Sequence, residues 1–148
     1  MKTRYIDLIE QTFDFPKDEF GLLDDRLTWN GIDLMAVIEK HGTPLRISYL
    51  PRIGQKVEQA RESFRKAFRE HKYVGTYDYF YCTKSNHFSY VIDKVLDKGV
   101  DLETSSAYDI EMIELLMERG RIRNDATVLC NGFKDERYIR KIGDLYKR

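Results

Sequence analysis

A lysine and a carboxylate lie at the ends of two apolar stretches, where strands of a buried sheet would finish. Lys84 directly follows the aromatic residues 77–83, and Glu103 lies near the end of residues 100–104. A lysine withdrawn from water has a lowered pKa, and its free amine can attack a carbonyl carbon to form a Schiff base. The plainer alternatives are a surface lysine at the start of a loop and a solvated acid at a strand end.

The face on which Lys84 lies decides between these alternatives. Side chains alternate along a strand, so Phe80, Cys82 and Lys84 would share one face. If the first two point into a core, Lys84 points into its open end and is desolvated. By the same rule Glu103 shares a face with Ser105, and its carboxylate could orient Lys84 or a cofactor.

Three polar clusters follow predicted strands, and ligands of parallel α/β folds bind at such ends. The clusters are Thr83-Lys84-Ser85-Asn86-His87, Glu103-Thr104-Ser105-Ser106 and Asn131-Gly132-Phe133-Lys134. His87 could titrate near neutral pH, although a structural role beside a helix start is the plainer interpretation. Turn chemistry alone could explain Asn131-Gly132. No catalytic triad, metal-ligand spacing or nucleotide-binding loop accompanies them.

Hydrophobic periodicity predicts the elements that position these clusters. Apolar residues at helical spacing indicate a short helix that His41 and Gly42 close, and a long helix from Pro51 that ends before Gly75. Ser106 and Asp109 are spaced as a capping box. The remaining predicted elements are strands at 77–83, 100–104 and 126–130, and helices at 88–96, 110–117 and 135–148.

This alternation of helices and strands predicts an α/β fold with a parallel sheet. Three strands could form a small open sheet or part of a (β/α)₈ barrel, which typically needs about 250 residues. The pattern becomes regular at Pro51, so we expect residues 1–50 to be an N-terminal segment and residues 51–148 to form the first part of a barrel domain.

Composition excludes several classes of protein. The chain has 148 residues and no net charge, which gives no electrostatic reason to expect nucleic acid or a membrane as partner. No apolar run approaches the ~20 residues of a membrane span, and no signal peptide is expected at the N-terminus. Cys82 and Cys130 form neither a CxxC pair nor a zinc spacing, which favours the reducing cytoplasm.

Four short motifs, in order along the chain, resemble those of one enzyme family. HGTPL and YFYCTKSN are similar to the entry motif and the cofactor-lysine strand of fold-type III PLP-dependent decarboxylases. DLETSSAYDIE and VLCNGFKDERYIR resemble segments of the biosynthetic arginine decarboxylases in that family. The chain therefore resembles the N-terminal portion of such an enzyme.

The resemblance implies a partial PLP-binding (β/α)₈ TIM barrel of the alanine-racemase-like type, with the first three βα units visible. It implies pyridoxal 5′-phosphate as cofactor, bound covalently through Lys84, with Glu103, Ser105 and Asn131 lining the site. The implied reaction is decarboxylation of arginine to agmatine, in polyamine biosynthesis. The implied partners are a small-molecule amino acid and, in the full-length protein, a second copy in a homodimer.

Some features depart from the family pattern. Thr83 stands where many members have Val, and Ser85 where they have Ala or Val. The family's phosphate-binding loop and C-terminal domain have no counterpart here, so we expect an N-terminal fragment that is incomplete as an enzyme. A diaminopimelate- or ornithine-type decarboxylase and a truncated, non-catalytic interaction module remain open alternatives.

Overall fold

The computed structural model describes residues 19–123 and 125–147, and these form two compact units. The first unit ends at Ser48 and the second begins at Tyr49. Each unit has its own sheet, and the second contains all three polar clusters singled out above. The expected division into an N-terminal segment and a barrel domain stays a prediction.

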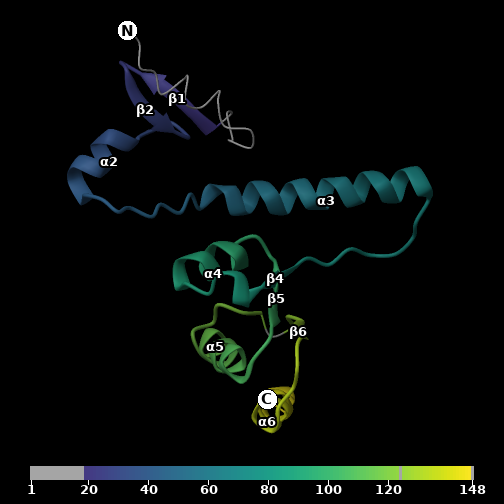
Figure 1. Cartoon of the computed structure of the whole chain (residues 1–148). Coiled ribbons are helices and arrows are strands. Elements are labelled where there is room, and N and C mark those ends of the chain that lie inside the picture. Colours follow the sequence, from purple (N-terminus) through teal and green to yellow (C-terminus); the bar gives the residue numbers. More distant parts are fainter. Residues whose placement is uncertain (1–18, 124, 148) are drawn as a thin grey trace. The chain divides into compact units, whose positions relative to one another are not determined.

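The first unit is a small antiparallel sheet followed by a helix (Figure 1). Its strands are β1 (Phe20–Leu23), β2 (Arg26–Trp29) and β3 (Ile32–Asp33), and they pair in the order β1-β2-β3. Helix α2 (Leu34–His41) confirms the predicted short helix. Gly42 follows it with φ 77°, a left-handed conformation in which the lack of a Cβ avoids strain.

Sequence reasoning missed this sheet. Both of its turns have two residues at positive φ, Asp24 and Asp25 in one and Asn30 and Gly31 in the other. Such primed turns match the right-handed twist of a hairpin, and Asn-Gly is the strongest short signal for them. The Asn30-Gly31 dipeptide could therefore have revealed the hairpin.

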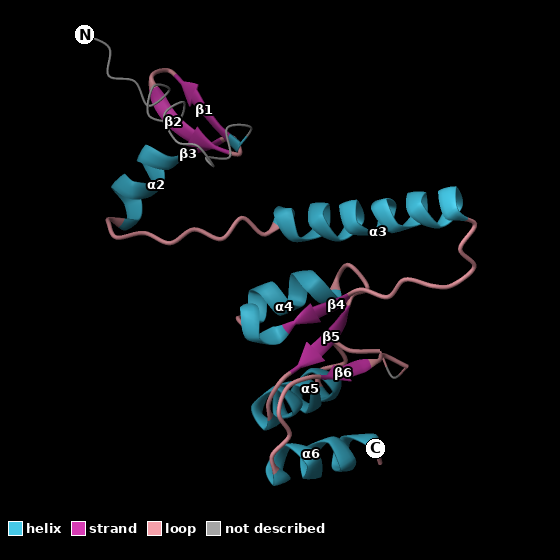
Figure 2. Ribbon diagram, turned by 45° about the vertical axis from the view of Figure 1, so that its right-hand side comes forward, coloured by secondary structure: helices cyan, strands magenta, loops and turns pink. Residues whose placement is uncertain are grey.

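The second unit alternates helices and strands, as predicted (Figure 2). Its long helix α3 confirms the helix expected from Pro51. The elements in order are α3 (Pro51–His71), β4 (Phe80–Cys82), η2 (Thr83–Ser85, a 3₁₀ helix), α4 (Ser89–Leu96), β5 (Asp101–Thr104), α5 (Ala107–Glu118), β6 (Val128–Cys130) and α6 (Glu136–Tyr146).

Strands β4, β5 and β6 form a parallel sheet in chain order, as the alternation predicted. The register places Tyr81 beside Leu102 and Leu102 beside Val128, so these three share one face. Helices α4 and α5 bury that face, and α6 packs beside α5 against Cys130 on the same side. All three helices therefore cover a single face of the sheet.

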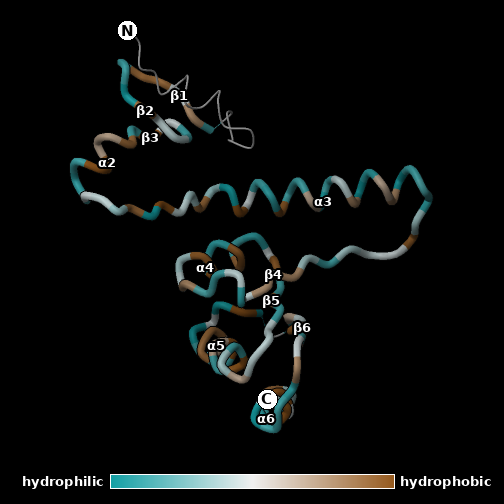
Figure 3. Tube along the Cα trace, in the orientation of Figure 1, coloured by the Kyte–Doolittle hydropathy of each residue, from teal (hydrophilic) through white to brown (hydrophobic). Residues whose placement is uncertain are grey.

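The core lies between this face and the helices. Val91, Ile92 and Val95 of α4 meet Ile113 of α5, and Val57 of α3 joins them. Teal and brown segments alternate along α3 in Figure 3, which agrees with its single apolar stripe. Val57 is buried and Ile53 is partly buried against this core, so the first half of α3 packs on the helical layer of the second unit.

The first strand is shorter than the predicted residues 77–83. Phe80 pairs with Asp101, the first residue of β5, and the segment before Phe80 has no described partner strand. Tyr77 instead stacks on Phe64 of α3, with ring centroids 3.9 Å apart. Stacking on a helix thus replaces strand pairing at the start of this segment.

Within the described ranges, no helix is both long enough and apolar enough to cross a membrane.

Candidate functional site

The three predicted polar clusters lie at the same edge of the parallel sheet. The register places Cys82 beside Glu103 and Glu103 beside Leu129, so the strands finish together. Lys84, Ser105 and Asn131 follow within two residues of these positions. The prediction that these strand ends lie on one side of a parallel sheet is confirmed.

Lys84 lies in the short helix η2 and not on the strand itself. Because the strand ends at Cys82, alternation does not extend to Lys84, and the expectation that it shares the face of Phe80 and Cys82 is wrong. Its side chain is exposed, so the predicted desolvation is absent from the described structure. The amine of Lys84 has no hydrogen-bond or ion-pair partner in residues 19–123 and 125–147.

Side chains on both sides of Lys84 hold its turn in shape. The hydroxyl of Tyr81 donates a hydrogen bond to the carbonyl of Asn86, 2.9 Å away. Ser85 Oγ donates to the carbonyl of Cys82 at 2.7 Å, and Asn86 Oδ1 accepts from the amide of Phe88 at 3.0 Å. These bonds close a compact turn, and the exposed side chain of Lys84 projects from it.

Glu103 contacts Asn131, which joins two of the predicted site residues. Asn131 Nδ2 donates to Glu103 Oε1 at 2.8 Å, and the Asn131 amide donates to the Thr104 carbonyl at 2.8 Å. Asn131 Oδ1 accepts from the amide of Gly132 at 2.6 Å. The Glu103 carboxylate therefore orients Asn131, and no described contact joins it to Lys84.

Ser105 belongs to the beginning of helix α5. The carboxylate of Asp109 accepts from the Ser105 amide at 2.8 Å and from Ser106 Oγ at 3.1 Å. Ser106 Oγ in turn accepts from the Asp109 amide at 3.3 Å, which confirms Ser106 as the N-cap residue of the predicted capping box. The carboxylate of Asp109 accepts from the Ser105 amide, one residue before the N-cap. Ser105, Lys84 and His87 line one shallow hollow.

A buried tyrosine packs behind this edge of the sheet. It lies within the predicted helix 135–148 and the motif VLCNGFKDERYIR, but the sequence did not indicate this contact. Tyr138 of α6 is 1% exposed, and its hydroxyl lies 2.9 Å from Thr104 Oγ1. Burial raises the pKa of the Tyr138 phenol above its usual value. The hydrogen bond fixes α6 to the end of β5, next to the Glu103–Asn131 pair.

Curated proteins similar to this chain share one name. The chain is 30% identical over 113 residues to a biosynthetic arginine decarboxylase of Alkalilimnicola ehrlichii, an alignment covering 74% of this chain and 17% of that protein. The resemblance to biosynthetic arginine decarboxylases is confirmed. The decarboxylase of the same name from Prochlorococcus marinus strain MIT 9301 is 26% identical over 132 residues, covering 83% of this chain and 20% of that protein.

A solved arginine decarboxylase shares the fold. The biosynthetic arginine decarboxylase SpeA of Campylobacter jejuni superposes with a TM-score of 0.63 at 23% identity, over 95% of this chain and 24% of that one. No protein-family model matches the chain. The chain thus spans about a fifth of the length of the arginine decarboxylases that it matches.

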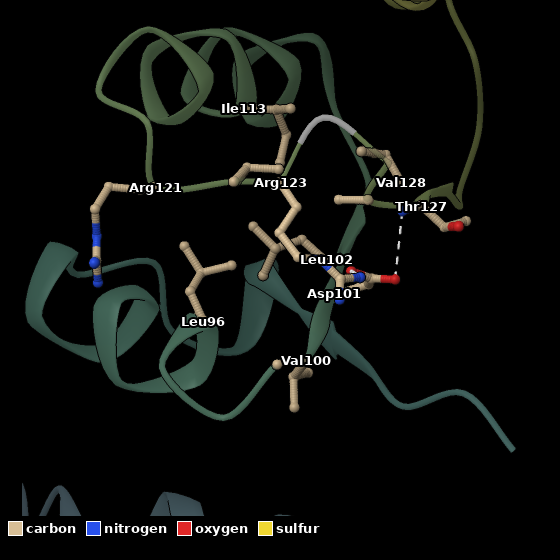
Figure 4. A pocket seen from close by; sticks show the side chains of 12 residues that line it. Leu96, Val100, Asp101, Leu102, Ile113, Arg121, Arg123, Thr127 and Val128 are labelled. Carbon is tan, nitrogen blue, oxygen red and sulfur yellow. Dashed lines mark hydrogen bonds and ion pairs between the residues drawn. The ribbon is translucent and has the colours of Figure 1, made fainter.

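A second cavity lies at the opposite end of the sheet from this edge (Figure 4). Leu96, Leu102 and Val128 line it, and Asp101 accepts a hydrogen bond there from the amide of Thr127 at 3.4 Å. Its volume of about 40 Å³ has room for only a few water molecules. The edge that carries Lys84 is therefore the candidate functional site.

The groups at this edge fit the attachment of an aldehyde cofactor and do not fit a metal ion. In the part of the chain that the structure describes, no group of three histidine, cysteine or acidic side chains could hold a metal. Lys84 offers an exposed primary amine without a partner. An amine of this kind can bond covalently to an aldehyde such as pyridoxal phosphate.

Proposed function

We propose that this chain is the part of a PLP-dependent arginine decarboxylase that carries the cofactor lysine, Lys84. The observation that carries the proposal is the position of the Lys84 amine, which projects without a partner from the carboxyl end of a parallel sheet. The proposed substrate, arginine, is taken from the name of the similar proteins, biosynthetic arginine decarboxylase. The proposed reaction of the whole protein is conversion of arginine to agmatine.

The topology supports our proposal that the sheet is a segment of a (β/α)₈ barrel. A doubly wound sheet reverses its strand order and thereby places helices on both faces. Here the order β4-β5-β6 follows the chain, and α4, α5 and α6 all cover one face. A barrel has this arrangement, with its helices outside and its catalytic residues at the carboxyl ends of the strands.

The described residues at this edge would have different roles in binding. Lys84 would hold the cofactor covalently, and the turn closed by Tyr81 and Asn86 would keep the lysine at a fixed point of the edge. Glu103 and Asn131 would present a carboxylate and an amide to the bound molecules from the neighbouring strands. PLP, when bound, supplies the electron sink that loss of CO₂ from an α-amino acid requires.

Two further properties of the whole protein follow from the resemblance and belong to the proposal. Cys82 and Cys130 are both free thiols, which is compatible with a reducing cytoplasm. We also expect the complete protein to be a homodimer. Ser105 would line the site of each copy, as the resemblance implies.

Labelling with the cofactor tests the assignment of Lys84. The purified chain is incubated with PLP and reduced with borohydride, and the modified peptides are then mapped. We expect the label on Lys84, because its amine lies at the carboxyl ends of the parallel strands, where ligands of such sheets bind. Lys84→Arg should abolish that label. Lys84→Arg should leave the melting temperature unchanged, because Lys84 has no partner in the described structure.

Lys134 provides the matched control. It is also exposed and lies at the same edge, but its Nζ donates to the carbonyl of Gly132 at 3.1 Å. Lys134→Arg should leave the label on Lys84 in place. Label on Lys134 that equals or exceeds the label on Lys84 in the wild-type chain, or label spread evenly over all lysines, would overturn the proposal.

A further inference from the structure

The residue before Lys84 is a fully buried threonine that reaches a neighbouring strand. Thr83 is 0% exposed, and its Oγ1 donates a hydrogen bond to the carbonyl of Glu103, 3.0 Å away. The regular pairing of β4 with β5 ends one residue earlier, where Cys82 lies beside Glu103. The Thr83 hydroxyl therefore extends the attachment of β4 to β5 beyond the last paired residue.

The other hydroxyls around Lys84 have a different effect. Ser85 bonds to Cys82 and Tyr81 bonds to Asn86, so both act within the turn itself. Such bonds fix the shape of the turn without fixing its position on the sheet. The Thr83 bond links the turn to another strand and therefore determines where Lys84 lies relative to that strand.

The partner of Thr83 is itself a residue of the candidate site. The Glu103 backbone accepts from Thr83, while the Glu103 carboxylate accepts from Asn131. Three adjacent strand ends are thereby joined through one residue. A shift of the turn away from β5 would move Lys84 relative to the Glu103–Asn131 pair.

We infer that Thr83 is a positioning residue, whose hydroxyl holds the Lys84 turn against β5 so that the lysine amine meets bound molecules at a fixed distance from Glu103 and Asn131. The inference rests on the proposed function of Lys84. It adds a role for a side chain that touches neither cofactor nor substrate.

Two substitutions separate the hydroxyl from the packing of this side chain. Thr83→Val keeps the branched shape and removes the hydrogen bond, whereas Thr83→Ser keeps the hydroxyl and removes a methyl group. Valine leaves the Glu103 carbonyl without this donor, and serine leaves a small void. A positioning role predicts that Thr83→Val loosens the turn and slows labelling of Lys84 more than Thr83→Ser does. A packing role predicts the reverse.

The first measurement needs no cofactor. Amide hydrogen exchange followed by mass spectrometry reports local opening of the turn, residues 83–88, against the rest of the chain. We expect Thr83→Val to raise exchange in this peptide about tenfold, a local effect that leaves the α5 peptide unchanged. Thr83→Ser should stay within about twofold of the wild type.

The second measurement is the rate at which PLP, trapped by borohydride, labels Lys84. Misplacement of a reacting group lowers rates steeply, so we expect Thr83→Val to slow labelling of Lys84 about tenfold. Labelling of Lys134 in the same sample serves as the internal control and should not change. Thr83→Ser should label Lys84 at nearly the wild-type rate.

Three results would decide against a proposal. Equal exchange and equal labelling in Thr83→Val and the wild type would overturn the positioning role. Faster exchange and slower labelling in Thr83→Ser than in Thr83→Val would overturn it as well, in favour of a packing role. If the wild-type chain shows no selective label on Lys84 but the exchange contrast is present, the function of Lys84 fails while the hold of Thr83 on the turn stands.

Discussion

The two faces of the parallel sheet differ in what they contact. On one face Leu102 and Thr104 are fully buried beneath α4, α5 and α6. On the other face Glu103 is only half-buried, although it lies between Leu102 and Thr104 on β5, and Leu129 of β6 is 43% exposed. Burial on the first face stabilises the unit, and it leaves the second face and the strand ends free for chemistry.

The largest expected difference in stability comes from truncating one apolar side chain on each face of the sheet. Ile113 of α5 is 0% exposed in the core, and Ile113→Ala should lower the free energy of unfolding by about 2–5 kcal/mol. Leu129→Ala on the open face should cost about 0.5 kcal/mol or less. Urea titration monitored by circular dichroism measures both, and similar losses in the two variants would remove the distinction between the faces.

A smaller effect is expected at the hydrogen bond behind the strand end. Tyr138→Phe removes the hydroxyl that meets Thr104 Oγ1 and should lower the free energy of unfolding by about 0.5–1.5 kcal/mol. Thermal unfolding at neutral pH measures this loss. An unchanged melting temperature would show that the other hydrogen bond of Thr104 Oγ1, to the carbonyl of Leu129 at 3.4 Å, is sufficient.

Burial of Tyr138 also predicts how stability depends on pH. Burial raises the pKa of Tyr138 in the folded chain, so the folded state keeps the phenolic proton at a pH where the unfolded state has lost it. The stabilisation is fully present below about pH 10, the pKa of an unfolded tyrosine, and is lost as the pH rises through the folded pKa. Stability should therefore fall less steeply above pH 10 in Tyr138→Phe than in the wild type.

The smallest effect is expected on the open side. Glu103→Gln keeps the shape of the side chain and an oxygen that can accept from Asn131 Nδ2. Because exposed charged pairs contribute little, we expect a change of about 0.5 kcal/mol or less in unfolding. If Glu103→Gln lowered the free energy of unfolding as much as Ile113→Ala does, the open face would also stabilise the unit.

Most of the second unit could be predicted because its signals are local. Helical spacing of apolar residues located α3, α4 and α5, and the capping box marked the beginning of α5. The length of β4 could not be predicted, because it depends on where β5 begins. Tyr77 fits a strand by propensity, but its ring stacks on Phe64 thirteen residues earlier, and propensity does not report such contacts.

The candidate site was predictable as a set of strand ends and not as a set of contacts. Parallel pairing was sufficient to bring Lys84, Glu103 and Asn131 to one edge. Alternation failed at Lys84 because η2 interrupts the extended backbone. The Thr104–Tyr138 bond joins residues 34 positions apart, and it depends on how α6 packs, which no local pattern specifies.

The carboxylate of Asp109 has a consequence for anions at this edge. The first turn of a helix attracts negative groups, through its free amides and its dipole. In α5 a side chain from within the helix already occupies that position, since Asp109 accepts bonds from Ser105 and Ser106. A phosphate or substrate carboxylate approaching α5 would meet a like charge instead of an open cradle.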